Sequence, residues 1–87
     1  MNWIIVAVYD TKIEAYMKPF FVPAIGAAIR SFQDEVNRAA DDNPMNKHPE
    51  DYALFRLGTY NDETGHIEPA TTPQALAQAH LLLNKPN

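Results

Sequence analysis

The titratable side chains of this chain match no established catalytic or metal-binding motif. The three histidines are widely spaced, and only one of them has acidic neighbours, in the segment "HPED". That segment places His48 near Glu50 and Asp51, which could form a metal site, although the spacing is not a known ligand pattern. The structural alternative is a helical turn that begins at Pro49 and is favoured by the two acidic residues at its amino end.

The remaining carboxylates and small residues indicate no reaction chemistry either. Asp34-Glu35 and Asp41-Asp42 are typical of solvated charges on a helix and a loop. The sequence has no G-x-S-x-G motif, no P-loop and no Rossmann fingerprint. It has no cysteine, so disulfides and thiol chemistry are excluded. We therefore predict no catalytic residue, no metal ligand and no cofactor, and expect no enzyme activity.

Aromatic and basic side chains form the one set that suggests binding. Single-strand binders stack bases on aromatic rings and hold phosphates with cations, and RNA-recognition sheets do so on a comparable layout. Protein interfaces are also enriched in aromatics and arginine. The net charge of −4 favours the interface interpretation. The candidate nucleic-acid or partner-binding residues are Tyr16, Lys18, Phe20, Phe21, Arg30, Tyr52, Arg56 and Tyr60.

The elements that position these residues follow from periodicity. The 87 residues predict one domain, residues 1–87, too small to bury a large core. Alternation and helical spacing predict the order β-α-β-β-α. Gly58 and Gly65 suit a strand bulge and a turn. The predicted elements are a strand at 3–9, a helix at about 24–40, strands at 51–60 and 66–70, and a helix at 73–85. The second and third strands meet at the turn "NDETG", and the third strand stops at Pro69.

This order predicts an α+β fold, a truncated ferredoxin-like three-stranded sheet with strand order 1-3-2 and both helices on one face. The first strand is nevertheless apolar on both faces. The uncovered face would carry Trp3, Ile5 and Tyr9 of that strand, joined by Tyr52, Arg56, Tyr60 and His66. Because monomers rarely leave such a patch bare, we expect a second subunit, the "PFFVP" arm or nucleobases to cover it. A homodimer is the expected assembly.

Two adjacent phenylalanines lie between Pro19 and Pro23. The prolines stiffen an extended connector, since each fixes its own φ and restricts the preceding residue. Adjacent side chains in an extended segment point to opposite sides. We therefore predict that one of Phe20 and Phe21 lies in the core, where alanine would cost about 3–5 kcal/mol, and that the other makes a surface contact.

Several strings resemble a known viral family. "VYDTKIEAYMKPFFVPAIGAAIRSF", "HPEDYALFRLGTYND" and "ETG" are similar to the small nonstructural protein of gokushoviruses, within the Microviridae. The resemblance runs from about residue 4 to 83. Its motifs are Y-D-T-K, Y-x-x-P-F-F, R-x-F and H-P-E-D-Y-x-L-x-x-L-G, in this order.

The resemblance implies a protein of a bacteriophage whose genome is single-stranded DNA. It implies a nonstructural accessory role in genome replication or packaging, through phage or host proteins, and it supplies no catalytic residues. The alternative is direct binding of single-stranded DNA. The apolar run at residues 3–9 is too short to span a membrane and has no signal-peptide flanks, so the host cytoplasm is the expected location.

Overall fold

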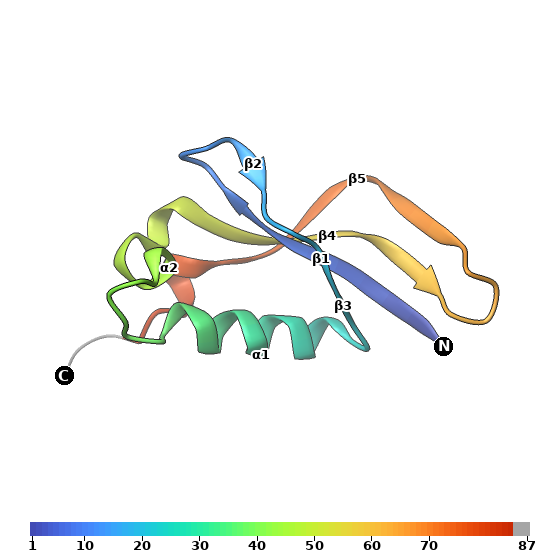
Figure 1. Cartoon of the computed structure of the whole chain (residues 1–87), viewed down its shortest axis with the longest axis horizontal. Coiled ribbons are helices and arrows are strands. Elements are labelled where there is room, and N and C mark those ends of the chain that lie inside the picture. The colour runs from blue at the N-terminus through green and yellow to red at the C-terminus, as the bar shows by residue number, and fades with distance from the viewer. Residues whose placement is uncertain (85–87) are drawn as a thin grey trace.

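The computed structural model describes residues 1–84, which form a mostly β structure of five antiparallel strands and three short helices (Figure 1). The longest helix is α1, Ile25–Val36. The other elements, in chain order around it, are β1 (Asn2–Asp10), β2 (Ala15–Tyr16), β3 (Phe20–Val22), α2 (Pro44–Lys47), the 3₁₀ turn η1 (Pro49–Asp51), β4 (Tyr52–Asn61), β5 (Ile67–Gln78) and α3 (Ala79–Leu82).

Strand β1 is the centre of the sheet. One of its edges pairs with β2 and then with β3, and its other edge pairs with β4, which in turn pairs with β5. The β2 register joins Tyr9 to Tyr16, whereas the β3 register joins Val6 to Phe20. The pairing is therefore interrupted by an extra residue between β2 and β3, where Pro19 has no N–H to donate.

The predicted ferredoxin-like, three-stranded fold with strand order 1-3-2 is wrong. The segment taken for a connector contains β3, which reverses the chain before α1 begins. Both β3 and β4 run antiparallel to β1, so α1 connects β3 to β4 instead of β1 to β4. As a result β1 and β4 are direct neighbours, and β4 lies between β1 and β5.

The predicted second helix is also wrong over most of its length. Residues 67–78 form the long strand β5, and only Ala79–Leu82 are helical. Pairing with β4 overrides the helical spacing of this alanine- and leucine-rich segment. Pro69 and Pro73 are tolerated because β5 is an edge strand. The predicted end of that helix at Lys85 lies outside the described residues.

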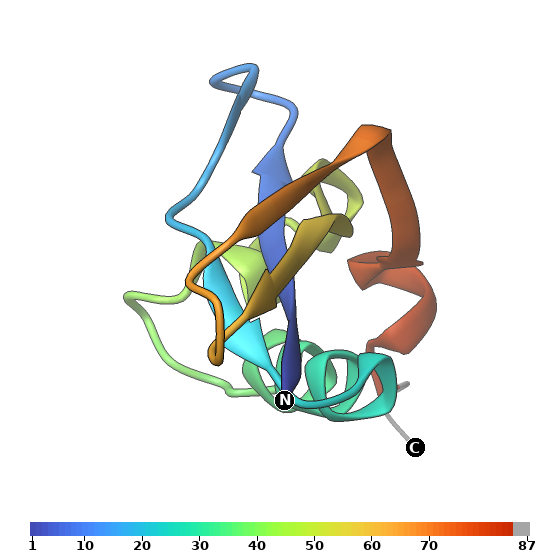
Figure 2. The ribbon, with the colours of Figure 1, turned by 90° about the vertical axis from the view of Figure 1, so that its right-hand side faces the viewer.

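The core lies between the sheet and α1, which runs along one side of the strands in Figure 1 and is seen nearly end-on in Figure 2. Val6, Val8 and Leu54 of the sheet pack in one cluster with Phe32 and Val36 of α1. The predicted helix at 24–40 is confirmed in position but ends earlier, at Val36. Apolar residues spaced along one face of α1 supply the helical half of the core.

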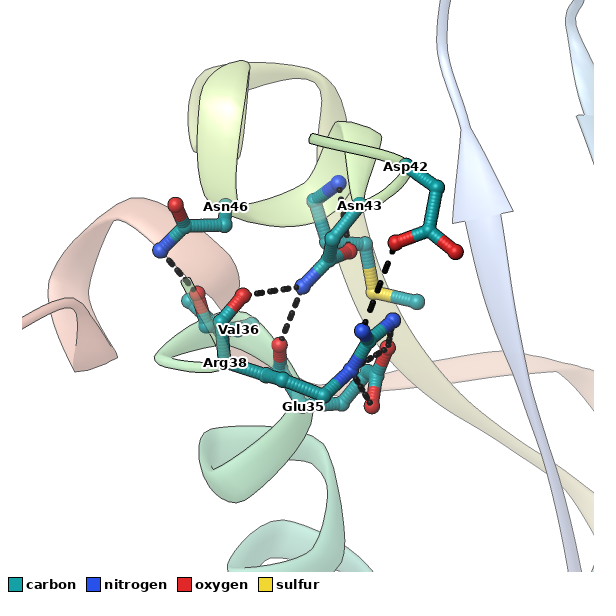
Figure 3. A network of polar contacts seen from close by, with 7 residues as sticks. Glu35, Val36, Arg38, Asp42, Asn43 and Asn46 are labelled. Atoms are coloured by element: carbon teal, nitrogen blue, oxygen red, sulfur yellow. Dashed lines mark hydrogen bonds and ion pairs between the residues drawn. The ribbon is translucent and has the colours of Figure 1, made fainter. Parts of the chain in front are cut away.

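Asparagines close the carboxyl end of α1 (Figure 3). The Asn43 side chain, 1% exposed, donates to the carbonyl oxygens of Glu35 and Arg38 at 2.7 and 2.8 Å. Asn46 donates to the Val36 carbonyl at 2.9 Å. The Val36 bond satisfies a carbonyl that the helix end leaves free, and the Asn43 bonds tie the last turn of α1 to the residues that follow it. The polar loop at 41–50 thereby fixes α2 against α1.

Candidate interaction surface

The side of the sheet that faces away from α1 is called the outer surface here. In β1, Trp3, Ile5, Ala7 and Tyr9 point to this side because Val6 and Val8 point to the core. Ile5 is 7% exposed and Ala7 is fully buried. Side chains of the neighbouring strands therefore cover the middle of β1, so the expected bare apolar patch is partly closed by the chain itself.

Two groups of aromatic rings provide this cover. At one end, Tyr9 packs edge-on against Tyr16 with ring centres 4.7 Å apart, and Phe55 lies 5.6 Å from Tyr16. At the other end, Phe21 lies 5.5 Å from Tyr60, also edge-on. These edge-on arrangements are the ones that aromatic quadrupoles favour.

The outer surface still offers apolar area to a partner. Phe21 is 48% exposed and Tyr16 is 40% exposed. A small hollow of about 180 Å³ lies among Trp3, Phe21 and Tyr60. Exposed rings beside a hollow can be buried by another apolar side chain or by a planar base.

The structure divides the predicted binding set between the two sides of the sheet. Tyr16, Phe21 and Tyr60 lie on the outer surface. Lys18 is exposed at the break between β2 and β3, and Arg30 is exposed on α1. The three members on the α1 side of the sheet are Phe20, Tyr52 and Arg56.

A β-bulge in β4 explains why Arg56 and Tyr60 do not share a face. Arg56 is opposite Val6, whereas Gly58 is opposite Ile5, so Leu57 is an extra residue on β4. One extra residue reverses the alternation beyond it. The prediction that Tyr52, Arg56 and Tyr60 line one strand face is therefore wrong for Tyr60. The same prediction placed Arg56 and Tyr52 beside Trp3 and Tyr9, and the structure places them on the opposite side.

Tyr52 cannot act as a stacking ring. It is 9% exposed and belongs to the core cluster. Burial raises the pKa of its hydroxyl, and the nearby Asp10 carboxylate adds to the shift. Little of the Tyr52 ring is therefore open to a base or a partner.

The predicted division between Phe20 and Phe21 is confirmed. Phe20 packs against the core, and Phe21 lies opposite Ile5 on the outer surface. The alternation of an extended strand produces this division, as the sequence suggested.

Phe55 joins the outer surface although the sequence pattern did not select it. It lies opposite Ala7 and contacts Tyr9. Trp3 and Tyr9 were expected on this face but were not among the candidate binding residues. The isolated Gly58 was the available signal, since a bulge there moves Phe55 to the face of Tyr9 and Tyr60.

A carboxylate borders the aromatic hollow. The Trp3 indole N–H donates to Asp62 Oδ2 at 3.0 Å, and the α-amino group of Met1 lies 2.8 Å from Asp62 Oδ1. Hydrogen bonds from the amino group and from Trp3 lower the pKa of Asp62. Asp62 therefore stays ionised at neutral pH beside Trp3, and its charge is balanced by that of the Met1 amino group.

The "HPED" segment forms the predicted turn. Pro49 begins the 3₁₀ turn η1, and its first turn contains Glu50 and Asp51. His48 Nδ1 is 3.9 Å from Glu50 Oε1. Within residues 1–84, His, Asp and Glu side chains form no group of three that could hold a metal ion.

The fold and the outer surface define a small β-rich domain with a candidate surface for macromolecular contacts. The family model described as "Phage ORF5 protein" matches residues 3–82, so the chain belongs to this bacteriophage protein family. Neither the curated proteins nor the solved structures include a significant match. Within residues 1–84, no helix has the length and apolar character needed to cross a membrane.

Proposed function

We propose that this chain is a nonstructural accessory protein of a gokushovirus and acts through protein–protein contacts. In this proposal it supports single-stranded DNA genome replication or packaging in the host cytoplasm and is not part of the virion. Membership of the bacteriophage family and the resemblance of the sequence motifs to those of gokushovirus proteins support the viral part. The single observation that carries the contact mode is the outer surface, which is aromatic, partly exposed and bordered by the Asp62 carboxylate.

We further propose a homodimer that uses the outer surface. A chain of 87 residues buries only a modest fraction of its unfolded surface and gains stability from a partner. Phe21 and Tyr16 are the most exposed rings of this surface, and aromatic residues are enriched at the centres of protein interfaces. Phage or host replication and packaging proteins are the other partners in this proposal.

Direct binding of single-stranded DNA is the second candidate function. Its support is the exposure of Tyr16 and Phe21, which could stack on bases, with Lys18 in the intervening segment. The position of Arg56 on the α1 side and the net charge of −4 weigh against it.

One pair of measurements separates the two functions. A fluorescent single-stranded oligonucleotide is titrated with wild type, Tyr60→Ala and Arg56→Ala at several salt concentrations, and light scattering gives the molar mass of each protein. The protein-contact proposal expects a dimer and weak DNA binding that is equal in all three proteins.

Direct DNA binding through the outer surface expects a different result. Affinity would fall steeply with salt, and Tyr60→Ala would cost about 1–3 kcal/mol per stacked base. Arg56→Ala is the matched control because Arg56 lies on the other side of the sheet. A monomer at tens of micromolar whose mass does not change on dilution would contradict the dimer.

A further inference from the structure

A second candidate site lies on the α1 side of the molecule, away from the outer surface. It is an open groove of about 710 Å³ between α1, α2 and the edge of the sheet. Val8, Phe20, Phe32 and Met45 supply its apolar lining. This volume is within the range of roughly 300–1,000 Å³ that is typical of ligand sites.

The groove is formed by elements that are fixed in place. Met45 belongs to α2, whose first turn is held by the hydrogen bond from the Met45 N–H to Asn43 Oδ1 at 3.2 Å. Asn43 itself is bonded to the end of α1 (Figure 3). On the sheet side, Val8 lies on β1 opposite the break between β2 and β3, and Phe20 is the first residue of β3. The groove is therefore preformed, and it opens where the edge of the sheet is interrupted.

The polar wall of the groove carries an excess of negative charge. Arg38 is fully engaged, because its guanidinium lies 2.7 Å from Glu35 Oε1 and 3.5 Å from Asp42 Oδ1. The hydrogen bond from Arg38 lowers the pKa of Glu35, which keeps this carboxylate charged at neutral pH. Asp34, which also lines the groove, forms no ion pair within the described residues. The lining thus holds one cation, Arg38, and two carboxylates, Asp34 and Glu35.

We infer that this groove binds a protein segment that inserts an apolar side chain between α1 and the sheet and places a lysine or arginine beside Asp34. The apolar lining favours a side chain such as leucine or phenylalanine. The negative wall favours a neighbouring cation and disfavours nucleic acid and acidic peptides. An open groove at a sheet edge suits an extended segment of another protein. This site is separate from the outer surface, so the domain could connect a partner protein to its own second copy.

The absence of cysteine from the sequence makes a direct test simple. Ser31 lines the groove and is exposed, so a fluorophore on S31C reports on its occupancy. The probe is a short acetylated peptide with phenylalanine and leucine between lysines. Two further peptides replace the lysines by glutamates or the two apolar residues by alanines. T72C, labelled in the same way on the exposed part of β5, is the control for nonspecific association.

We expect a saturable signal from labelled S31C with the lysine peptide, and at least tenfold weaker binding of the two altered peptides. Adding D34N should weaken binding about two- to fivefold at low salt, since one exposed charge pair contributes little. Salt should reduce the difference. Binding should be unchanged by F21S, which alters the outer surface alone, and this separates the groove from the proposed dimer contact.

Three results would overturn the inference. They are the absence of saturation up to millimolar peptide, equal responses to the three peptides, and an equal response from labelled T72C. Because Asp34 is exposed on α1, D34N should keep the wild-type melting temperature. Loss of binding in that variant therefore cannot be attributed to unfolding.

Discussion

The polar groups at the asparagine-closed end of α1 find their partners within the chain, whereas the aromatic rings of the outer surface stay partly exposed. At the end of α1, Asn43 is 1% exposed and each polar atom of its side chain has a partner in the chain. On the outer surface, Phe21 is 48% exposed, and its ring is only partly covered by Tyr60. The first region is complete within one molecule, whereas the second has apolar area left to bury. Stability should therefore depend on the first region, and assembly on the second.

The largest expected effect is that of Asn43→Ala. The change leaves the Glu35 and Arg38 carbonyls without their buried donor and removes the cap of α2. Each lost partner of a buried polar group costs about 1–3 kcal/mol, so we expect a loss of about 3 kcal/mol in the free energy of unfolding. Urea unfolding at neutral pH measures it.

Asn46→Ala is the matched control for that experiment. Its side chain donates one hydrogen bond, to the Val36 carbonyl, so the loss should be about 1 kcal/mol. Equal stability of the Asn43→Ala variant and wild type would contradict the view that the asparagines hold this end of the molecule together.

Gly58→Ala tests the bulge that shapes the outer surface. An added Cβ would lie 2.4 Å from the Glu68 carbonyl oxygen and 2.9 Å from Pro69 Cα, both backbone atoms of β5. We expect a loss of about 2–3 kcal/mol because β4 and β5 must separate. Gly26→Ala is the control, since its Cβ would meet nothing within 4 Å and alanine favours the helix. A Gly58→Ala variant as stable as wild type would contradict the close approach of the β5 backbone to Gly58.

Phe20→Ala and Phe21→Ala compare the two sides of the sheet directly. Phe20 is half-buried against the core, so its loss should cost about 2 kcal/mol, less than the 3–5 kcal/mol of a fully buried phenylalanine. Phe21→Ala should cost less than about 1 kcal/mol but should weaken the proposed dimer. Thermal melting and light scattering on both variants measure the two effects. If Phe21→Ala lowered the melting temperature more than Phe20→Ala, the assignment of roles would be reversed.

The smallest effect concerns pH and the Glu35–Arg38 pair. Hydrogen bonding to Arg38 lowers the folded-state pKa of Glu35 from its ordinary value of 4.5. Its stabilising contribution is therefore present above that value and is lost as the pH falls through the lowered pKa. Both side chains are well exposed, so the contribution should be below about 1 kcal/mol. Urea unfolding of wild type and Glu35→Gln at neutral pH and at pH near 3 checks it. The prediction would be contradicted if the difference in free energy of unfolding between the two proteins did not shrink at low pH.

The sequence predicted the local elements better than their arrangement. The strand at 3–9 follows from a continuous run of apolar residues, the strand at 51–60 from alternation, and the position of α1 from helical spacing. All three are local signals. The separation of Phe20 from Phe21 follows from the same alternation. The strand β3 was missed because three residues between prolines carry too weak a local pattern. The strand β5 was missed because its alanines and Leu76 favour a helix, and only the pairing with β4 holds them extended.

The sequence by itself determined that this is a small, cysteine-free, acidic domain with an apolar first strand and aromatic side chains near it. Its motifs also indicated that the chain is related to a phage protein family. The tertiary structure alone decided which aromatic residues share a face, because one extra residue at Leu57 reverses the alternation of β4. It also decided that the polar loop at 41–50 closes α1, since Asn43 and Asn46 meet the carbonyls of α1 only after the chain folds back. Side-chain direction depends on pairing between distant segments, and no local pattern in the sequence specifies that pairing.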